Sequence, residues 1–521
     1  MAALIPLLQS LWQEPHDHGV AAQLIFFLFF PLFLLLLKHR STRVSNLKLP
    51  PSPPKLPIIG NLHQIRTFPH RSLRSLSNKY GPLMLLRLGS VPTLVVSSPE
   101  MVKEIMKTND VVFSNHARPT SVDISFNGGQ DLVFSPYGEY WRQLRKICVQ
   151  ELLSHHRVQS QQFLRDEEVD VLIQRIRRSC LDHKEGSINL TELLLDVTNY
   201  IVCRSVLGQR YEGEGGKSRW GELSVKLVLA FPTFFFRDYF PCLGWMDELL
   251  GMMRSLEKTS KEADAFLEQA IKEQEMLKTD SSSLSHKRYF LDILLQLKAN
   301  GSQSFDLNRA TIKAILLDLF VGATDTSRTT MEWAMTELMR NPHIMKKVQQ
   351  EIRQVVGKKS KIDANDVNHM GYFKCVIKET LRLHAPAPLL VPRETSATTR
   401  LGGYEIPQKA RVYINAWAIQ RDPKVWDKAE EFIPERFEKN NLADSIDQEY
   451  KFFPFGGGRR ICPGVSYGLA TIEYAMANLL YWFDWELPAG VKGEDLDMSE
   501  IFGLAIQKKV PLHVVPIPYN P

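Results

Sequence analysis

The sequence predicts a mostly α-helical protein with a minor β portion, preceded by one N-terminal transmembrane helix. Nearly every segment from residue 141 to about residue 350 repeats apolar residues at helical spacing. The clearest strand signal is a hairpin pattern around a turn at Gly89–Pro92. An uncharged apolar run from Val20 to Leu37 is about as long as a bilayer-spanning helix.

The composition indicates a globular protein, since 44% of the 521 residues are hydrophobic and 23% are charged. A net charge of +6 is too weak to indicate nucleic acid as a partner, and it suits an acidic partner or an anionic membrane surface. The six cysteines form no C-x-x-C pair. Neither a disulfide framework nor a structural zinc site is therefore predicted, and a reducing compartment follows.

Basic residues fix the expected orientation of the apolar run. Lys38, Arg40 and Arg43 follow it, so the positive-inside rule leaves the rest of the chain in the cytosol. A cleaved secretory signal is the alternative, but there the basic cluster would precede the run.

Three regions are expected. They are an N-terminal segment (1–37) with the anchoring helix at about 20–37, a basic and proline-rich linker (38–57), and one catalytic domain (58–521).

Two local patterns locate helices in the catalytic domain. Ser98 and Pro99 have the residue types of an N-cap and a first helical position. The stretch from Asp306 to Arg340 contains no proline, and Asn341-Pro342 closes it. A helix of that length must pass through the core.

The segment "FPFGGGRRICPG" surrounds Cys462 with glycine, arginine and proline. Glycines let the main chain approach closely, and their amides are expected to point at the sulfur. Pro463 is expected to open a helix that Cys462 caps, and these effects together should lower the pKa of the thiol. A buried thiolate of this kind is stable only beside a cation.

Several kinds of cysteine or glycine site compete for this segment. A phosphate-binding loop needs Lys-Ser or Lys-Thr after the glycines, and a zinc site needs partner ligands at short spacing; the sequence has neither. A nucleophilic cysteine needs a histidine base, and the chain has 14 histidines, so this alternative stays open. One protein thiolate suffices where a porphyrin fills four positions of the metal.

The segment resembles the F-x-x-G-x-R-x-C-x-G signature of haem-thiolate monooxygenases, the cytochrome P-450 family. It matches at every fixed position: Phe455, Gly458, Arg460, Cys462 and Gly464. The spelling is similar to that of the plant microsomal branch. The resemblance implies haem b with Cys462 on the iron, and a single-pass protein of the endoplasmic reticulum membrane whose catalytic domain faces the cytosol.

Other motifs of the family follow in order. "KETLR" and "PERF" contain Glu379, Arg382 and Arg436, for which the resemblance implies a buried ion network. "WRQLRK" contains Trp141 and Arg145, which resemble residues that bind the haem propionates. Arg460 resembles another propionate-binding residue, and so does Arg393 in "VPRET".

The long helix contains "GATDTS", in which Gly322 and Thr326 share a face. The resemblance implies a dioxygen site there, with Thr326 donating or steadying a water and Asp325 relaying protons. The family often has glycine where this chain has Ala323, so the groove should be slightly narrower.

The resemblance implies oxygen insertion driven by NADPH. No nicotinamide or flavin site is evident in the sequence, so a membrane-bound NADPH-dependent flavoprotein reductase is the expected partner. A basic surface formed by Arg142, Lys146, Lys451 and Arg459 is expected to meet it. Two rival functions are a haem-thiolate isomerase or dehydratase, which needs no reductase, and a non-enzymatic haem sensor.

The substrate is expected to be lipophilic because the segments that vary in the family lean apolar here: 121–128, 317–321, 387–391 and 501–506. A plant terpenoid is the first expectation, and an alkaloid or phenylpropanoid is the alternative. The aromatic run from Phe231 to Phe240 is expected to reach membrane lipid at the entrance.

Overall fold

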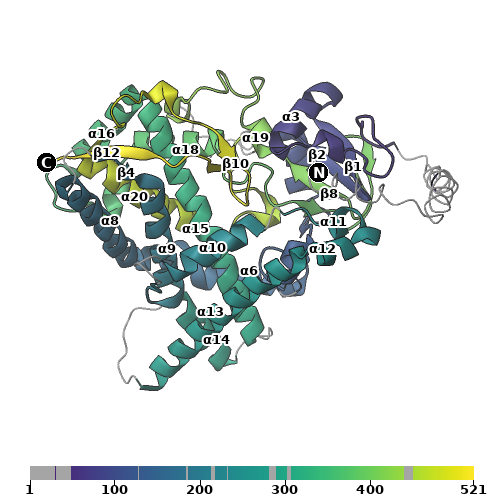
Figure 1. Ribbon diagram of the computed structural model, residues 1–521, viewed down its shortest axis with the longest axis horizontal. Coiled ribbons are helices and arrows are strands. Elements are labelled where there is room, and N and C mark those ends of the chain that lie inside the picture. Colours follow the sequence, from purple (N-terminus) through teal and green to yellow (C-terminus); the bar gives the residue numbers. More distant parts are fainter. Residues whose placement is uncertain are drawn as a thin grey trace, which may run out of the picture. The chain divides into compact units, whose positions relative to one another are not determined.

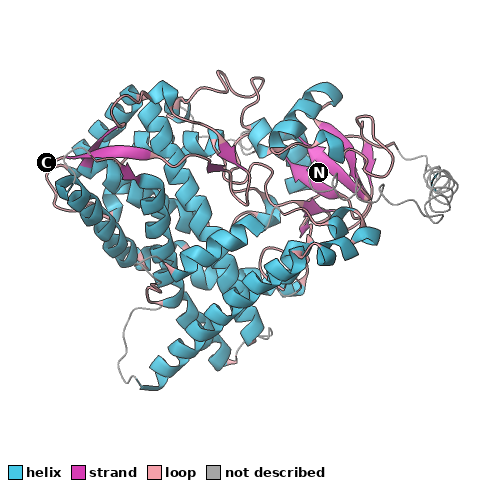
Figure 2. Cartoon of the chain, viewed as in Figure 1, coloured by secondary structure: helices cyan, strands magenta, loops and turns pink. Residues whose placement is uncertain are grey.

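The computed structural model describes residues 30, 48–126, 128, 130–182, 186–212, 218–230, 233–280, 289–301, 307–438 and 450–521. Helices dominate and strands are short, as predicted (Figure 1, Figure 2). The chain divides into two compact units, Met1–Leu49 with Gly403–Glu405 and Pro50–Gly402 with Ile406–Pro521. In the first unit, the N–H of Glu405 donates to the carbonyl of Lys48. The second unit holds every residue of the predicted site.

The helices follow one another along the chain. They are α3 Pro69–Tyr80, α4 Pro99–Lys103, α5 Thr120–Ser125, α6 Glu139–Ile147, α7 His155–Ser160, α8 Gln162–Asp182, α9 Leu190–Leu207, α10 Arg219–Ala230, α11 Phe236–Tyr239, α12 Trp245–Leu249, α13 Met252–Asp280, α14 Phe290–Asn300, α15 Arg309–Arg340, α16 Pro342–Val356, α17 Ala364–Asn368, α18 Gly371–Leu383, α19 Ala416–Ile419 and α20 Val465–Trp482.

The strands are much shorter. They are β1 Leu83–Leu88, β2 Val91–Val96, β3 Asn115–His116, β4 Ile188–Asn189, β5 Arg393–Glu394, β6 Thr399–Leu401, β7 Tyr404–Ile406, β8 Arg411–Ile414, β9 Phe483–Glu486, β10 Glu500–Ile501, β11 Gln507–Lys508 and β12 His513–Pro518.

Strands β1 and β2 form the predicted hairpin, with Leu83 opposite Val96. They belong to a five-stranded sheet of order β1-β2-β8-β5-β3, in which β8 runs parallel to β2. The predicted start of the next helix is also confirmed. Pro99 is the first residue of α4, and the Ser98 side chain accepts the N–H of Met101.

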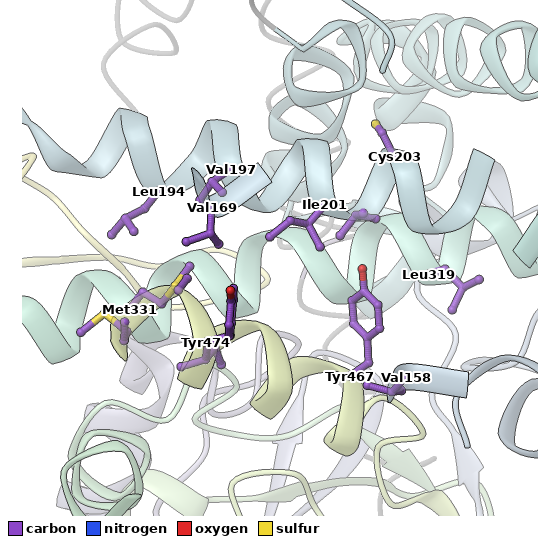
Figure 3. Close-up of a cluster of buried hydrophobic side chains, with 14 of the residues drawn as sticks. Val158, Val169, Leu194, Val197, Ile201, Cys203, Leu319, Met331, Tyr467 and Tyr474 are labelled. Carbon is purple, nitrogen blue, oxygen red and sulfur yellow. The ribbon is translucent and has the colours of Figure 1, made fainter. Parts of the chain in front are cut away.

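Helix α15 is the predicted long helix. The side chain of Asn308 caps it by accepting the N–H of Thr311, and Asn341 follows its last residue. The helix is buried along most of its length and contacts α9, α18 and α20. Figure 3 shows part of this core, in which apolar side chains from α7, α8, α9, α15 and α20 meet. The core therefore holds α15 in a fixed position relative to α20, which follows Cys462.

The predicted membrane anchor at about 20–37 lies outside the described residues, apart from Phe30. Within the part of the chain that the structure describes, no helix is both long enough and apolar enough to cross a bilayer. Part of the predicted linker is described, and there the carbonyl of Pro51 accepts the N–H of Leu85 in β1.

Candidate active site

The glycines before Cys462 allow two segments to pack closely. Gly458 has a φ of +67°, and a Cβ there would lie 2.6 Å from Asp110 Oδ1 and 2.7 Å from the carbonyl oxygen of Met106. Only glycine fits both the backbone conformation and the space. The N–H of Arg459 donates to Asp110 as well. The sequence predicts that these glycines serve the sulfur, whereas the structure shows that Gly458 brings the loop against the π-helical turn η2 (Glu104–Thr108).

The turn after Cys462 differs from the prediction. Helix α20 begins at Val465 with Gly464 as its N-cap, so the expectation that Pro463 opens the helix and Cys462 caps it is wrong. Pro463 and Gly464 form a turn instead, which directs the N–H of Gly464 to the Cys462 sulfur. The sulfur therefore receives a backbone donor from this turn.

Burial raises the pKa of the Cys462 thiol, and the N–H of Gly464 and the charge of Arg145 oppose that rise without cancelling it. The predicted lowering of this pKa is wrong, because desolvation of a thiolate outweighs both favourable contacts. The side chain is nevertheless accessible to solvent. A sulfur that protein surrounds but solvent can reach is suited to a metal ion, whose charge removes the penalty for the thiolate.

Arg460 is buried and joins two segments of the chain. Its guanidinium donates to the carbonyl groups of Ser114, Leu132, Val133 and Ser135. The same guanidinium lies 4.3 Å from the centre of the Trp141 ring. The indole N–H of Trp141 donates to the Leu132 carbonyl at 2.9 Å. Trp141 therefore supports the arginine through its ring while its N–H has a partner in the protein.

Arg145 and Arg393 lie near Arg460. Burial lowers the pKa of Arg460 to about 9, and the charges of Arg393 and Arg145 contribute to that shift. Arg393 donates to the carbonyl of Gly457 at 2.7 Å, and Arg145 donates to that of Ile461 at 2.7 Å. The loop that carries Cys462 is thus bonded to two of the three arginines.

The residues present fit a haem group. The three guanidiniums repel one another, and an added dianion would relieve that repulsion. Two propionates supply that charge and the planar geometry that arginine prefers. Cys462, the metal-binding candidate, lies close enough to Arg145 for the positive charge of Arg145 to act on the pKa of the thiol. The structure thus brings together four predicted positions, Arg145, Arg393, Arg460 and Cys462.

The middle of α15 has an accessible stretch in an otherwise buried helix. Gly322 is exposed, and Ala323 and Thr326 are half-buried. A Cβ added at Gly322 would meet nothing within 4 Å. The hydroxyl of Thr326 donates to the carbonyl of Gly322 at 2.7 Å. This face therefore offers space beside a hydroxyl, as the predicted dioxygen site requires.

Asp325 lies in a different environment from Thr326. It is buried, and its carboxylate pairs with Arg328 at 3.1 Å and accepts two bonds from the Gln507 amide, at 2.9 and 2.8 Å. Sequence reasoning missed Arg328 and Gln507. Arg328 stands three residues after Asp325, a spacing that places the two on one helix face. No sequence signal pointed to Gln507, because it is far away along the chain.

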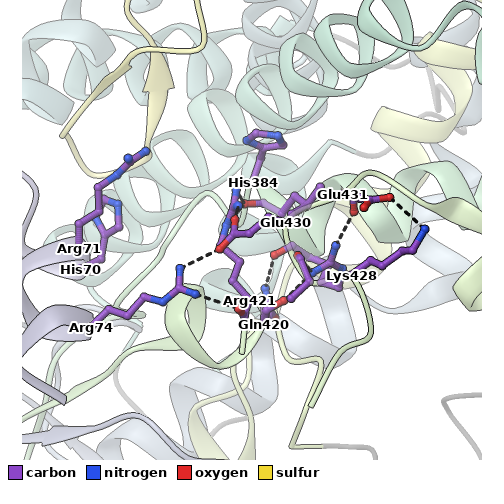
Figure 4. A network of polar contacts seen from close by, with 12 residues as sticks. His70, Arg71, Arg74, His384, Gln420, Arg421, Lys428, Glu430 and Glu431 are labelled. Carbon is purple, nitrogen blue, oxygen red and sulfur yellow. Dashed lines mark hydrogen bonds and ion pairs between the residues drawn. The ribbon is translucent and has the colours of Figure 1, made fainter. Parts of the chain in front are cut away.

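The predicted ion network beneath the site is confirmed. Glu379 is fully buried and pairs with Arg382 at 2.7 Å and with Arg436 at 2.9 Å. Arg382 also donates to the carbonyls of Gln420 and Ala429. Figure 4 shows neighbouring contacts, in which Arg421 and Arg74 both reach Glu430. These bonds tie the segment 420–436 to helix α18.

Comparison with known proteins gives a consistent answer. The family model for cytochrome P-450 matches residues 50–514. The chain is 47% identical to phenylacetaldehyde oxime monooxygenase of Prunus mume, over all of both chains. It is 43% identical to costunolide synthase of Lactuca sativa, over 93% of this chain and 97% of that one.

Similar relationships hold for a third relative and for a solved structure. Desmethylyatein synthase of Sinopodophyllum hexandrum is 44% identical over 95% of this chain and 98% of its own. A zebrafish cytochrome P-450 with progesterone superposes with a TM-score of 0.73 at 25% identity, over 87% of this chain and all of that one. The chain therefore belongs to the cytochrome P-450 family of monooxygenases, whose cofactor is haem b.

Proposed function

We propose that this protein is a membrane-anchored monooxygenase that hydroxylates or epoxidises a lipophilic plant specialised metabolite, with dioxygen and with electrons from NADPH through a flavoprotein reductase. The observation that carries the proposal is Cys462, which protein surrounds and solvent can still reach, beside Arg145. The accessible face of α15 with Gly322 and Thr326 supports the oxygen chemistry.

Each site residue has one proposed task. Cys462 binds the iron, and Phe455, Gly458 and Gly464 shape its loop; Phe455 accepts the N–H of Cys462 at 2.9 Å. Arg145, Arg393 and Arg460 hold the propionates, and Trp141 supports Arg460 through its ring, because its N–H already donates to the Leu132 carbonyl. The haem supplies activation of dioxygen, which the thiolate ligand favours.

Two residues of the long helix α15 are proposed to deliver protons to the dioxygen site. The Thr326 hydroxyl holds a water at the accessible face and passes it a proton. Asp325 supplies protons to that face, and this step requires the carboxylate to exchange its bond with Gln507 for one to water.

The proposed substrate is a terpenoid, supported by the apolar segments predicted to line the pocket and by the similarity to costunolide synthase. An aromatic aldoxime is a second candidate, because phenylacetaldehyde oxime monooxygenase matches the chain over its full length. Both candidates are small and lipophilic.

The proposed setting is the endoplasmic reticulum membrane, with residues 58–521 as the haem domain in the cytosol. Exposed apolar side chains near the predicted aromatic run support contact with lipid: Phe234, Trp245, Leu249 and Leu250. On the proposed reductase side, Lys146 and Arg459 are exposed.

The experiment is expression of the full chain in microsomes with an NADPH-dependent reductase. The reduced carbon monoxide spectrum should show the thiolate band, and Cys462→Ser should lose it together with turnover. A panel that contains sesquiterpenes and phenylacetaldehyde oxime then separates the two substrates. Turnover of a hydroperoxide without reductase would favour the isomerase or dehydratase instead, and binding of haem with no NADPH consumption would favour a sensor.

A further inference from the structure

Two buried carboxyl groups that the proposed chemistry does not use, those of Asp131 and Asp318, both accept backbone N–H groups from the segment 131–135. Asp131 lies before helix α6, and Asp318 lies on α15 about two turns before Thr326. Oδ2 of Asp318 accepts the N–H of Leu132 at 2.7 Å. Oδ1 of Asp131 accepts the N–H of Phe134 at 2.5 Å. One oxygen of each carboxyl group is therefore satisfied by the segment 131–135.

The second oxygen of each carboxyl group is an orphan. Oδ2 of Asp131 and Oδ1 of Asp318 are buried, and no donor in the described part of the chain reaches them. A buried acceptor without a donor is destabilising, because it has given up its hydrogen bonds to water and has gained none in the protein. Ionised carboxylates only accept hydrogen bonds, whereas a protonated one can also donate. A single proton between the two groups would give both orphan oxygens a partner.

The electrostatic environment favours that proton. Burial raises the pKa of Asp131 to about 6, although the backbone bonds and the charges of Arg460 and Arg118 act against the rise. Burial, and then the negative charge of Asp131, raise the pKa of Asp318 well above its usual value. The two backbone N–H groups that these carboxyl groups accept belong to Leu132 and Phe134, two residues apart, which places the carboxyl groups on one short segment.

Two further titratable groups feel this pair. Burial is the main cause that raises the pKa of Tyr140, and the charges of Asp131 and Asp318 raise it further. Burial also raises the pKa of Cys148, and the charge of Asp318 adds to that rise. Both groups are neutral at ordinary pH and would ionise only to anions, so neither of them can balance a negative charge on the two aspartates.

We propose that Asp131 and Asp318 share one proton and thereby clamp the segment 131–135 to helix α15. That segment supplies the carbonyls of Leu132, Val133 and Ser135 to Arg460, and the Leu132 carbonyl to Trp141. The clamp therefore sets the position of Arg460 relative to the helix that carries Thr326. Asp131 and Asp318 are positioning residues, and their effect on haem retention rests on the proposed role of Arg460.

The sign of the pH effect follows from the two pKa values. An aspartate in the unfolded chain has a pKa of about 3.9. Burial raises the pKa of Asp131 to about 6 and that of Asp318 well above its usual value, so the shared proton is the one that Asp318 keeps after Asp131 has ionised. The folded state therefore binds more protons than the unfolded chain until pH passes the folded pKa of Asp318. The contribution of the clamp is complete below the unfolded pKa and is lost as pH rises through the folded pKa. A clamp that used an ionised Asp318 would show the opposite sign.

Two variants of nearly equal size test the proposal. In Asp318→Asn the amide oxygen can accept the Leu132 N–H while its N–H₂ donates to Asp131, so the variant mimics the protonated clamp at every pH. Asp318→Leu can do neither. The measurement is the rate at which the purified holoprotein loses haem to an excess of a haem-binding apoprotein, from about pH 5 to about pH 10, a range that includes pH values well above the pKa of Asp131.

The natural protein and Asp318→Asn should lose haem at about the same rate at low pH. As pH increases, the natural protein should come to lose haem about tenfold faster than Asp318→Asn at the same pH. Asp318→Leu should lose haem about tenfold faster than Asp318→Asn at every pH. Equal rates for Asn and Leu, or a difference between the natural protein and Asp318→Asn that shrinks as pH rises, would overturn the proposal.

Infrared spectroscopy gives a second readout that depends on neither haem loss nor turnover. The difference spectrum of the natural protein minus Asp318→Asn should contain a carboxylic acid carbonyl band that disappears as pH rises, and Asp131→Asn should remove it too. If the band is present and haem loss is unchanged, the proposed role of Arg460 fails while the shared proton stands. If the band is absent, the shared proton fails, and this result decides the matter even where Asp318→Leu does not fold.

Discussion

The guanidinium of Arg460 lies 4.3 Å above the ring of Trp141, and both residues bond to the carbonyl of Leu132. These contacts join α6, the loop before it and the cysteine loop around one buried cation. Arg393 and Arg145 add positive charge near Arg460, and Asp131 and Asp110 offset that charge only in part, because the pKa of Arg460 stays low.

Replacement of Arg460 by alanine should reduce haem content at least about tenfold, since it removes a proposed propionate partner and leaves several buried carbonyls without a donor. The measurement is haem per polypeptide in purified protein. Arg459→Ala is the matched control, because the side chain of Arg459 is exposed and its partner Asp110 keeps the backbone N–H of residue 459. Equal loss in both variants would contradict the role of Arg460.

Gly458→Ala should destabilise the cysteine loop, because the new Cβ would fall 2.6 Å from Asp110 Oδ1 and 2.7 Å from the Met106 carbonyl oxygen. Gly490→Ala is the control that measures the destabilisation due to positive φ alone, without a steric clash. Gly490 has a φ of +83° and its Cβ would meet nothing within 4 Å, so about 1 kcal/mol is expected there. The urea midpoint of the holoprotein and its carbon monoxide spectrum are measured for both variants. A Gly458 variant as mild as the Gly490 variant would show that the close approach is not needed.

Glu379→Ala should lower the free energy of unfolding by about 3–5 kcal/mol, because Arg382 and Arg436 would lose their shared carboxylate inside the protein. Glu431→Ala removes a comparable charge from an exposed pair with Lys428 and should change stability by less than about 1 kcal/mol. Denaturant unfolding compares them. Similar midpoints for the two variants would rule out a structural role for the buried network.

Thr326→Val should uncouple electron use from product formation by about tenfold or more, because the methyl group cannot hold a water or pass a proton. Oxidation of NADPH should continue while peroxide replaces product. Thr324→Val is a close control, since the Thr324 hydroxyl makes the same bond to the carbonyl four residues earlier but is buried. The ratio of product to NADPH consumed measures the effect, and an unchanged ratio in Thr326→Val would remove this residue from the proton path.

The largest features of the fold followed from patterns within a few tens of residues. The hairpin at β1 and β2, the cap at Ser98 and the long helix ending at Arg340 all depend on local propensity and periodicity. The start of α20 did not follow, because proline at position 463 is compatible with both a first helical residue and a turn, and the local sequence does not distinguish them.

The pKa of Cys462 shows the same limit. Its local sequence contains every feature that lowers a thiol pKa, and burial still raises it, since desolvation depends on how much protein surrounds the sulfur. Two further interactions join positions far apart along the chain, so no local sequence pattern could predict them. They are the bond from Gln507 to Asp325 and the interaction of Asp131 with Asp318.

The sequence by itself determined the family, the cysteine proposed to bind the iron, and the positions of the hairpin and the long helix, because short motifs and periodic apolar residues indicate each of them. Only the tertiary structure decided which charged or titratable groups become neighbours: Arg145 and Arg393 near Arg460, and Asp318 on the segment that follows Asp131. The physical reason is that side-chain types and helical periods are local properties, whereas burial and the distance between charges arise only when remote segments pack together.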